Sequence, residues 1–287
     1  MDDSADFSGG TAIRGRILLL VSLGALAVFA YDGVVRQLLH GVVGLPLLTG
    51  NLGTLTSIVA LFSLSHAWYS LGGRLTATFF ALSAVISWAF EQAGVATGIV
   101  YGSYHYTDYL GAKLGHVPIL IPLAWFMMAY PSYVLANLIL ARKPNGTPPG
   151  RRSLVGLAAV GAVVMTVWDL VIDPILSGPS VKAWIWETGG PYFGIPIQNY
   201  IGWMATTFTV YVAYRAVEQR MPAAPAGPMR YRIAALPVAA YGLMLVADLL
   251  SGVAPAALSL IGPAVMGPPL IVAAWRIRRL AGRNATV

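Results

Sequence analysis

Apolar runs of about twenty residues recur along the whole chain, separated by short polar or Gly- and Pro-rich segments. A helix needs about twenty apolar residues to cross the hydrocarbon core of a bilayer. The pattern therefore predicts membrane-spanning helices. We expect an all-α polytopic membrane helix bundle with about eight spans, near residues 15–32, 52–71, 75–97, 117–140, 153–173, 197–217, 231–250 and 257–277.

These spans leave no stretch for a separate soluble domain. We expect a polar N-terminal tail at 1–14, one integral membrane domain at 15–280 and a short tail at 281–287. The acidic N-terminal segment lacks the small-residue cleavage site of a signal peptide, so we expect the first helix to be retained. Composition agrees, because only 10% of residues are charged and the mean hydropathy is +0.70, whereas about 25% are charged in soluble domains.

The net charge of +7 is explained by membrane topology rather than by a nucleic-acid partner. If the N-terminus lies inside, fifteen of the 18 lysines and arginines fall in inside regions, and only Arg36, Lys113 and Lys182 fall outside. Cytoplasmic segments of membrane proteins are enriched in Lys and Arg. The distribution predicts a multi-pass protein of the plasma membrane with both termini in the cytoplasm and the lipid bilayer, not nucleic acid, as its surroundings.

Five carboxylates lie near the predicted outer ends of the helices that run outward. A charged residue at the bilayer centre costs about 2.5–3.5 kcal/mol on insertion scales, so such residues are functional candidates. Several helices therefore aim acids at one depth in the outer half of the membrane. The alternative is that the acids cap helix ends at the headgroup level, and it applies most to the first of them. The five are Asp32, Glu91, Asp169, Asp173 and Asp248.

Asp169 and Asp173 share one helix face, because they are four residues apart. Pro174 disfavours the helical conformation at Asp173, so we expect the helix to end there, with Asp173 near the interface and Asp169 one turn deeper. Two carboxyls this close in a poor dielectric do not both ionise easily, so one should hold a proton. A structural pair bonded to backbone amides is the alternative.

Aromatic and glycine residues fill the outer segments beside these acids. An interfacial belt of Trp and Tyr explains some of them. It does not explain the alternation in Tyr104-x-Tyr106 and Trp184-x-Trp186, which is also expected of a pocket lining. Aromatic faces attract cations, so such a lining would also suit a carbocation. The candidate substrate-binding residues are Trp168, Tyr101, Tyr104, Tyr106, Trp184, Trp186, Tyr192, Asn199, Trp203 and Asp248.

The remaining chemistry-bearing residues exclude several classes of protein. Cysteine is absent, which excludes disulfides and thiolate catalysis. The four histidines do not form the paired boxes of membrane di-iron enzymes, and a single metal held by His105, His116 and a carboxylate has only a weak pattern. Lysines occur only in loops, which argues against a retinal Schiff base. We expect no metal and no cofactor.

The chain resembles the carotenoid biosynthesis proteins that include CruF-type carotenoid 1,2-hydratases and archaeal bisanhydrobacterioruberin hydratases. The resemblance covers roughly residues 50–215. It implies cofactor-free addition of water to the terminal C1=C2 bond of an acyclic ψ-end group, with a lycopene- or bisanhydrobacterioruberin-like carotenoid as substrate. The matching segments are Glu91-x2-Gly94-x2-Thr97-Gly98-x2-Tyr101-Gly102-x-Tyr104-x-Tyr106, Val117-Pro118-x3-Pro122-x2-Trp125, Trp168-Asp169-x3-Asp173-Pro174, and Trp184-x-Trp186 through Gly202-Trp203.

Catalytic roles follow from the chemistry rather than from the resemblance. Protonation of C2 places positive charge on tertiary C1, which water then captures. We expect Asp169 to be the acid, and Asp173 or Glu91 to position the water. Trp168, Tyr104, Trp186 and Tyr192 are candidates to face the cation.

Two alternatives remain open at the sequence level. Asp169-x3-Asp173 also looks like half of the Mg²⁺-diphosphate motif of a membrane prenyltransferase, although a second Asp-rich cluster is missing. Acids inside membrane helices also suit a proton-conducting transporter, and the aromatic lining suits a non-catalytic carotenoid- or lipid-binding protein.

Overall fold

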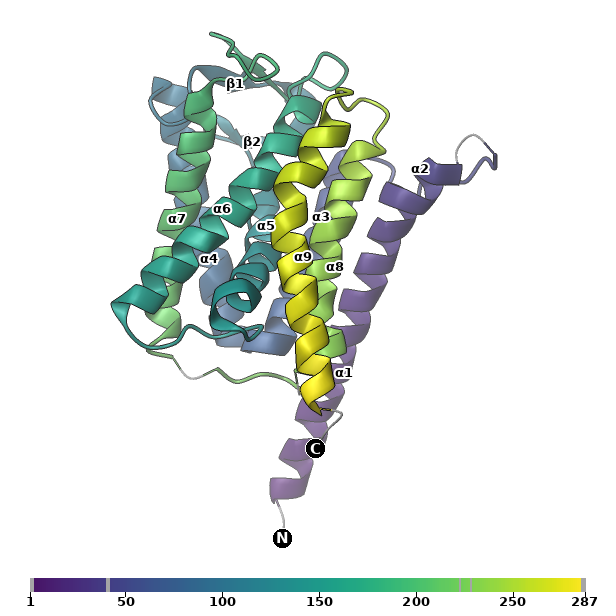
Figure 1. Ribbon diagram of the computed structural model, residues 1–287, viewed down its shortest axis with the longest axis vertical. Helices are drawn as coiled ribbons and strands as arrows, with labels where there is room; N and C mark the ends of the chain where they lie inside the picture. Colours follow the sequence, from purple (N-terminus) through teal and green to yellow (C-terminus); the bar gives the residue numbers. More distant parts are fainter. Residues whose placement is uncertain (1–2, 40–41, 222, 228, 285–287) are drawn as a thin grey trace.

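The computed structural model describes residues 3–39, 42–221, 223–227 and 229–284, and it is an all-α bundle (Figure 1). For these residues the predicted fold class is confirmed, with eight long helical segments. They are α1 (Asp3–Ala30), α3 (Leu52–Leu71), α4 (Gly73–Thr97), α5 (Leu120–Ala136), α6 (Arg151–Leu176), α7 (Ile197–Glu218), α8 (Tyr231–Leu249) and α9 (Leu258–Asn284).

The first and last helices are longer than the sequence pattern predicts. Helix α1 begins at Asp3, within the segment expected to be a polar tail, and continues through the π-helical turn η1 (Tyr31–Val35) into α2 (Arg36–Leu39). Helix α5 likewise continues through a π-helical turn, η3 (Asn137–Ala141). Helix α9 extends through most of the expected C-terminal tail, and residues 1–2 and 285–287 lie outside the described part of the chain.

Six of the eight long segments are long and apolar enough to cross a membrane. The other two, α3 and α7, are more polar. Several of their hydroxyls bond within the protein: Thr206 donates to the Gly202 carbonyl at 2.8 Å, and Ser63 donates to the Met127 carbonyl at 2.8 Å. Hydrogen bonds of this kind lower the cost of polar side chains inside a membrane bundle. Helix α5 forms the core, because every residue from Trp125 to Ala136 is buried.

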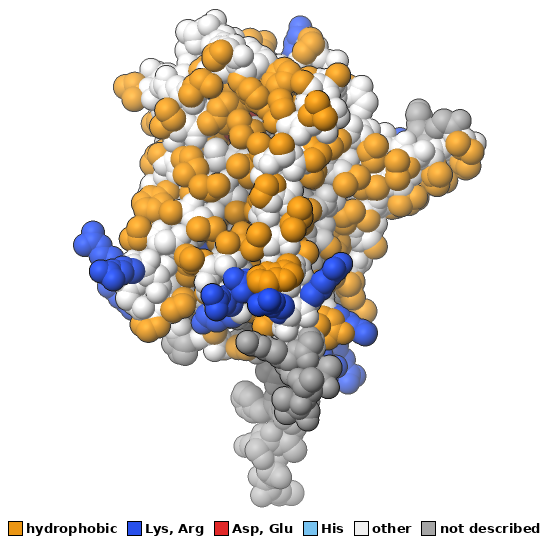
Figure 2. Space-filling view, in the orientation of Figure 1, with side chains coloured by type: hydrophobic (Ala, Val, Ile, Leu, Met, Phe, Trp, Pro, Cys, Tyr) orange, Lys and Arg blue, Asp and Glu red, His pale blue; other side chains and the backbone are white. Residues whose placement is uncertain are grey.

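The two ends of the bundle differ in character. The short strands lie at one end, and α1 begins and α9 ends at the other (Figure 1). Lys and Arg side chains gather in a band at this second end, and hydrophobic side chains cover most of the face between the two ends (Figure 2). We refer to the second end as the basic end and to the first as the strand end.

Two short antiparallel pairs, which the sequence analysis did not predict, cover the strand end. Strand β1 (Tyr104–Tyr106) pairs with β4 (Trp184–Trp186), so that Tyr104 lies opposite Trp186 and Tyr106 opposite Trp184. We call this pair the aromatic ribbon. Alternate residues of a strand point to one face, so the ribbon turns two tyrosines and two tryptophans into the bundle. Strands β2 (Lys113–Leu114) and β3 (Val117–Pro118) form the second pair, after the 3-10 turn η2 (Asp108–Leu110).

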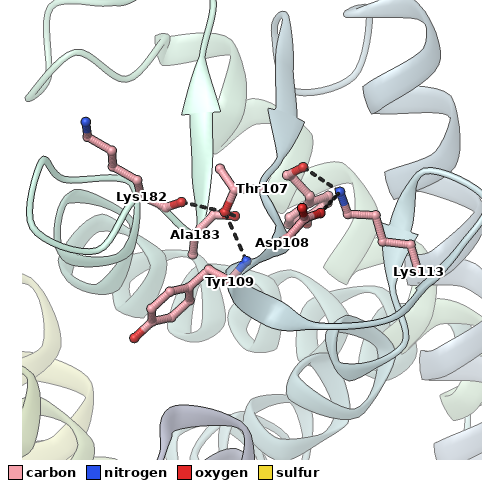
Figure 3. A network of polar contacts seen from close by, with 7 residues as sticks. Thr107, Asp108, Tyr109, Lys113, Lys182 and Ala183 are labelled. Atoms are coloured by element: carbon pink, nitrogen blue, oxygen red, sulfur yellow. Dashed lines mark hydrogen bonds and ion pairs between the residues drawn. The ribbon is translucent and has the colours of Figure 1, made fainter.

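Side-chain contacts hold the aromatic ribbon to its neighbouring loops (Figure 3). The Thr107 hydroxyl donates to the Lys182 carbonyl at 2.7 Å, and the Thr107 amide donates to the Ala183 carbonyl at 3.1 Å. The Lys113 ammonium donates to the Tyr106 carbonyl at 2.8 Å. Two segments far apart in sequence are thereby joined immediately beside β1 and β4.

A buried polar network lies at the basic end, and we call it the Arg215 network. Arg215 is fully buried and donates to the Asn137 side-chain oxygen and the Thr147 hydroxyl, each at 2.9 Å. The Glu218 carboxylate accepts from Tyr133 at 2.5 Å and from Thr147. The network ties α7 to α5, η3 and the loop that follows.

Candidate functional site

Four of the five membrane carboxylates converge on one cavity of about 150 Å³ beneath the aromatic ribbon. Glu91 comes from α4, Asp169 and Asp173 from α6, and Asp248 from α8. The predicted convergence is present, and we call this space the acidic cavity. Twelve of the thirteen predicted site residues line it: Glu91, Tyr101, Tyr104, Tyr106, Trp168, Asp169, Asp173, Trp184, Trp186, Asn199, Trp203 and Asp248.

Asp32 does not belong to this group. Its two carboxylate oxygens accept from the backbone amides of Leu48, at 3.0 Å, and Thr49, at 2.8 Å. Asp32 therefore ties η1 to the following loop, which is a structural role outside the acidic cavity.

Glu91 is surrounded by aromatic donors. One of its oxygens accepts from the Tyr104 hydroxyl and, at 2.8 Å, from the Tyr106 hydroxyl, and the other accepts from the Trp125 indole nitrogen at 3.1 Å. Burial first, and then the nearby Glu91 carboxylate, raises the pKa of Tyr104 and of Tyr106 well above its ordinary value. Both phenols therefore stay protonated and donate to Glu91.

Asp169 and Asp173 are joined by one amide. The side-chain nitrogen of Asn199, in the first turn of α7, donates to an oxygen of Asp169 at 2.9 Å and to an oxygen of Asp173 at 2.8 Å. The other oxygen of Asp173 accepts from the indoles of Trp184 at 2.8 Å and Trp186 at 3.3 Å. Asp173 thus receives three side-chain donors, and Asp169 receives one.

The predicted end of the helix at Asp173 is wrong. Helix α6 continues to Leu176, with Pro174 inside its last turn. Proline at this position cannot bond the carbonyl four residues earlier, but the Tyr192 hydroxyl donates to that Leu170 carbonyl at 2.8 Å instead. The backbone stays satisfied, so the helix passes through the proline.

Asp169 and Asp173 are both buried inside the bundle, and each is only 1% exposed. One further expectation needs correction. Tyr192 does not line the acidic cavity. It supports the helix that carries the two acids.

Three tryptophans form a wall of the acidic cavity. The rings of Trp125 and Trp203 are stacked with centroids 4.1 Å apart, and Trp168 meets Trp203 edge to face at 6.2 Å. The Trp168 indole nitrogen donates to Asp248 at 3.2 Å. An aromatic surface therefore extends from the acid pair to the fourth carboxylate.

Glycines place Tyr101 between two helices. A Cβ atom at Gly94 of α4 would lie 2.6 Å from the Tyr101 ring, and one at Gly202 of α7 would lie 2.5 Å from it. The Tyr101 hydroxyl bonds the Thr206 hydroxyl at 2.8 Å. The glycines of the sequence motif thus make room for a ring of the cavity wall.

Sequence reasoning missed the apolar part of the lining. Trp125 lies in one of the segments that resemble the carotenoid biosynthesis proteins, but it was not among the candidate site residues, and it too lines the cavity. The side chains of Phe29, Val59, Met127 and Met244, from α1, α3, α5 and α8, give the cavity an apolar arm. No signal marks them, because apolar residues in membrane helices resemble those that face lipid.

The described residues do not bring His105, His116 and a carboxylate together as a metal site. His105 points away from the ribbon's aromatic face and pairs with Glu187 at 2.5 Å, and both side chains are half exposed. Among the residues that the structure describes, no three His, Asp or Glu side chains are grouped so that they could hold a metal ion.

Comparisons with known proteins agree with the resemblance seen in the sequence. The family described as "Carotenoid biosynthesis protein" matches residues 52–273, well over half of the chain. The bisanhydrobacterioruberin hydratase of Haloarcula japonica is 36% identical over 119 residues. That match covers 41% of this chain and only 37% of the relative's length. No solved structure matches the chain.

Proposed function

This chain belongs to the family of carotenoid biosynthesis proteins, and on that premise we propose that it is a membrane hydratase that adds water to the C1=C2 bond of an acyclic carotenoid ψ-end group. The relative's name supports the reaction class. The observation that carries the proposal is the acid pair itself: two buried carboxyls, unequally supplied with donors, face an aromatic cavity with an apolar arm.

The number of hydrogen bonds that each carboxyl accepts supports a choice of which one holds the proton. Two carboxyls that share one amide nitrogen in a buried site repel each other when both are charged, so one keeps its proton. Asp173 accepts three hydrogen bonds, which stabilise its charged form, whereas Asp169 accepts one. We therefore assign Asp169 as the acid and Asp173 as the carboxylate base.

Asp169 and Asp173 together can supply and recover the proton that the reaction needs. Asp169 gives its proton to C2, which leaves a tertiary cation at C1. A water molecule attacks C1 and gives a proton to Asp173. Transfer of that proton from Asp173 to Asp169 restores the starting state, and the net change is the addition of one water to the double bond. Positioned acids and bases of this kind contribute about 10²–10⁴-fold each.

The aromatic residues divide into two roles in this proposal. The Trp168 and Trp203 rings border the acid pair and stabilise the cation, an interaction that contributes about 0.5–2 kcal/mol. Trp184 and Trp186 keep Asp173 charged. Glu91 accepts three donors from aromatic side chains, two of them on the aromatic ribbon. Because Asn199 joins Asp173, and not Glu91, to Asp169, we assign Asp173 as the base and Glu91 to holding the aromatic ribbon in place.

The apolar arm accommodates the rest of the substrate. The arm is the part of the lining formed by Phe29, Val59, Met127 and Met244, and a polyene has no polar group that would need a partner there. The end group would lie against Asp169, and the chain would leave toward the membrane interior.

A pigment assay tests this proposal. The chain is expressed in a host that makes lycopene, and the carotenoids are separated and weighed by mass spectrometry. We expect a product heavier than lycopene by one water. A product heavier by a prenyl unit would support the prenyltransferase instead, and unchanged lycopene would support a binding protein or a transporter.

One feature of the site already argues against the prenyltransferase. Among the described residues that line the acidic cavity there is no Lys or Arg. Enzymes that bind a diphosphate neutralise its charge with metal ions and basic side chains, and this lining supplies no basic side chain.

A further inference from the structure

Two arginines lie against one tryptophan at the basic end, and a third lies near one of them. The Arg276 and Arg279 guanidinium carbons lie 4.6 Å and 4.0 Å from the centroid of the Trp275 ring, on the last turns of α9. Arg142, at the end of η3, lies close enough for its charge to act on Arg276. We call these four residues the arginine cluster.

The backbone at Arg142 is unusual. Its φ of 60° is left-handed, and it ends the helical segment formed by α5 and η3. Glycine is the residue favoured at such a position, and other residues adopt it at a cost. An arginine in this place is therefore a reason to look for a function of its side chain.

Within the described residues, none of these arginines forms an ion pair with an acidic side chain. The ion pairs in the described part of the chain are His105–Glu187 and Lys113–Asp108, and both lie at the strand end. The Arg276 Nε atom is shielded from solvent and has no hydrogen-bond partner. The negative end of the α9 dipole acts only within its last turn, and Arg276 lies eight residues before the helix ends at Asn284.

We propose that the arginine cluster binds the phosphate of an anionic phospholipid. Guanidinium groups bind phosphate through two parallel hydrogen bonds. The cluster lies at the basic end, where a band of Lys and Arg side chains borders the apolar surface (Figure 2). Trp275 is 42% exposed, as expected of a ring at the headgroup level. Basic pockets between membrane helices bind anionic headgroups in this way.

Lipid titration of the purified full-length chain in detergent tests the proposal. Phosphatidylglycerol and phosphatidylcholine are added separately, and bound lipid is counted by native mass spectrometry. We expect a preference for phosphatidylglycerol, and a loss of about fivefold in its affinity for each arginine removed. The variants are Arg142→Gly and the double variant Arg276→Gln with Arg279→Gln.

The Arg142→Gly variant distinguishes a loss of lipid binding from a loss of folding. Glycine fits the left-handed backbone better than arginine does, so this variant should be at least as stable to heat as the wild type while it binds the lipid less tightly. Arg152→Gln is the matched control, because Arg152 is an exposed arginine in the first turn of α6 at the same end. It should leave the affinity unchanged.

Three results would overturn the proposal. Equal binding of the two lipids would show that the site does not recognise the anionic headgroup. An equal loss in Arg152→Gln would show a general attraction to the basic end. Displacement of the lipid by inorganic phosphate at the same concentration would show a site for a free anion instead.

Discussion

The protein buries two polar clusters, one at each end of the bundle, and they differ in what surrounds them. In the Arg215 network the charged groups lie among protein atoms: Arg215 sits 4.6 Å from the Tyr133 ring and 5.8 Å from the Tyr211 ring, and none of its members lines the acidic cavity. At the strand end, the carboxyls border an open space. Asp169 there has one donor, and its second oxygen is left for another partner.

This difference separates a structural cluster from a reactive one. Both clusters place ionisable groups where a membrane helix carries them at a cost, so burial alone does not distinguish them. The Arg215 network does not border the acidic cavity, and we expect it to stabilise the fold, although two nitrogens of Arg215 have no hydrogen-bond partner in the part of the chain that the structure describes. A carboxyl with a single donor beside a cavity, such as Asp169, can exchange a proton with a substrate.

The largest expected effect comes from Asp169→Asn. The amide has nearly the same shape but cannot protonate C2, so we expect hydration to fall at least about 100-fold. The rate of product formation from lycopene in isolated membranes measures this. Size-exclusion chromatography checks that the variant is folded, and near-normal hydration by a folded variant would remove Asp169 from the role of acid.

Arg215→Met should lower the stability of the fold but leave the hydration rate nearly unchanged. It removes two hydrogen bonds from a charged donor, which contribute roughly 1.5–3 kcal/mol each, so we expect a lower free energy of unfolding and a lower Tm. The hydration rate per folded molecule should stay within about twofold of the wild type. A large loss of rate at unchanged Tm would mean that the basic end takes part in the reaction.

A smaller effect is expected from Trp184→Phe combined with Trp186→Phe. The rings remain, but Asp173 loses two of its three donors. A hydrogen bond to a charged group contributes about 1.5–3 kcal/mol, but water in the cavity can replace most of this stabilisation. We therefore expect roughly a tenfold loss in hydration rate.

Trp88→Phe is the control for this pair. The Trp88 indole donates to the Leu114 carbonyl at 3.3 Å, near the same end, and does not line the acidic cavity. An equal loss in the control would show that the pair acts on packing at the strand end rather than on Asp173.

The smallest effect should come from Asp32→Asn. Asp32 bonds only backbone amides outside the acidic cavity, so hydration should change by less than about twofold. Thermal stability should fall modestly, because the hydrogen bonds from the Leu48 and Thr49 amides to a charged acceptor are weakened. A strong loss of hydration would place Asp32 in the catalytic group after all.

The sequence predicted the helices and the meeting of the acids well, because both depend on patterns that repeat along the chain. Long apolar runs mark the spans, and acids at one depth on outward-running helices have to come close in a bundle. The alternating pairs Tyr104-x-Tyr106 and Trp184-x-Trp186 also predicted a shared face, although not that a strand pair forms it.

The errors arose where distant residues decide local structure. Pro174 stays inside α6 because Tyr192 takes the freed carbonyl, and no local pattern shows that contact. A structural role was already a stronger alternative for Asp32 than for the other acids, but the sequence does not show that the loop at Leu48 and Thr49 folds onto it. Asn199 carried no spacing signal, because its role is to join two residues of another helix.

Isotope labelling of the product tests the proposed hydration most directly. The membranes are incubated with lycopene in water that carries heavy oxygen and, separately, in deuterated water. We expect heavy oxygen in the new tertiary hydroxyl and one non-exchangeable deuterium at C2, both lost in Asp169→Asn. Oxygen taken from dioxygen, or a product without deuterium at C2, would contradict protonation by the acid pair.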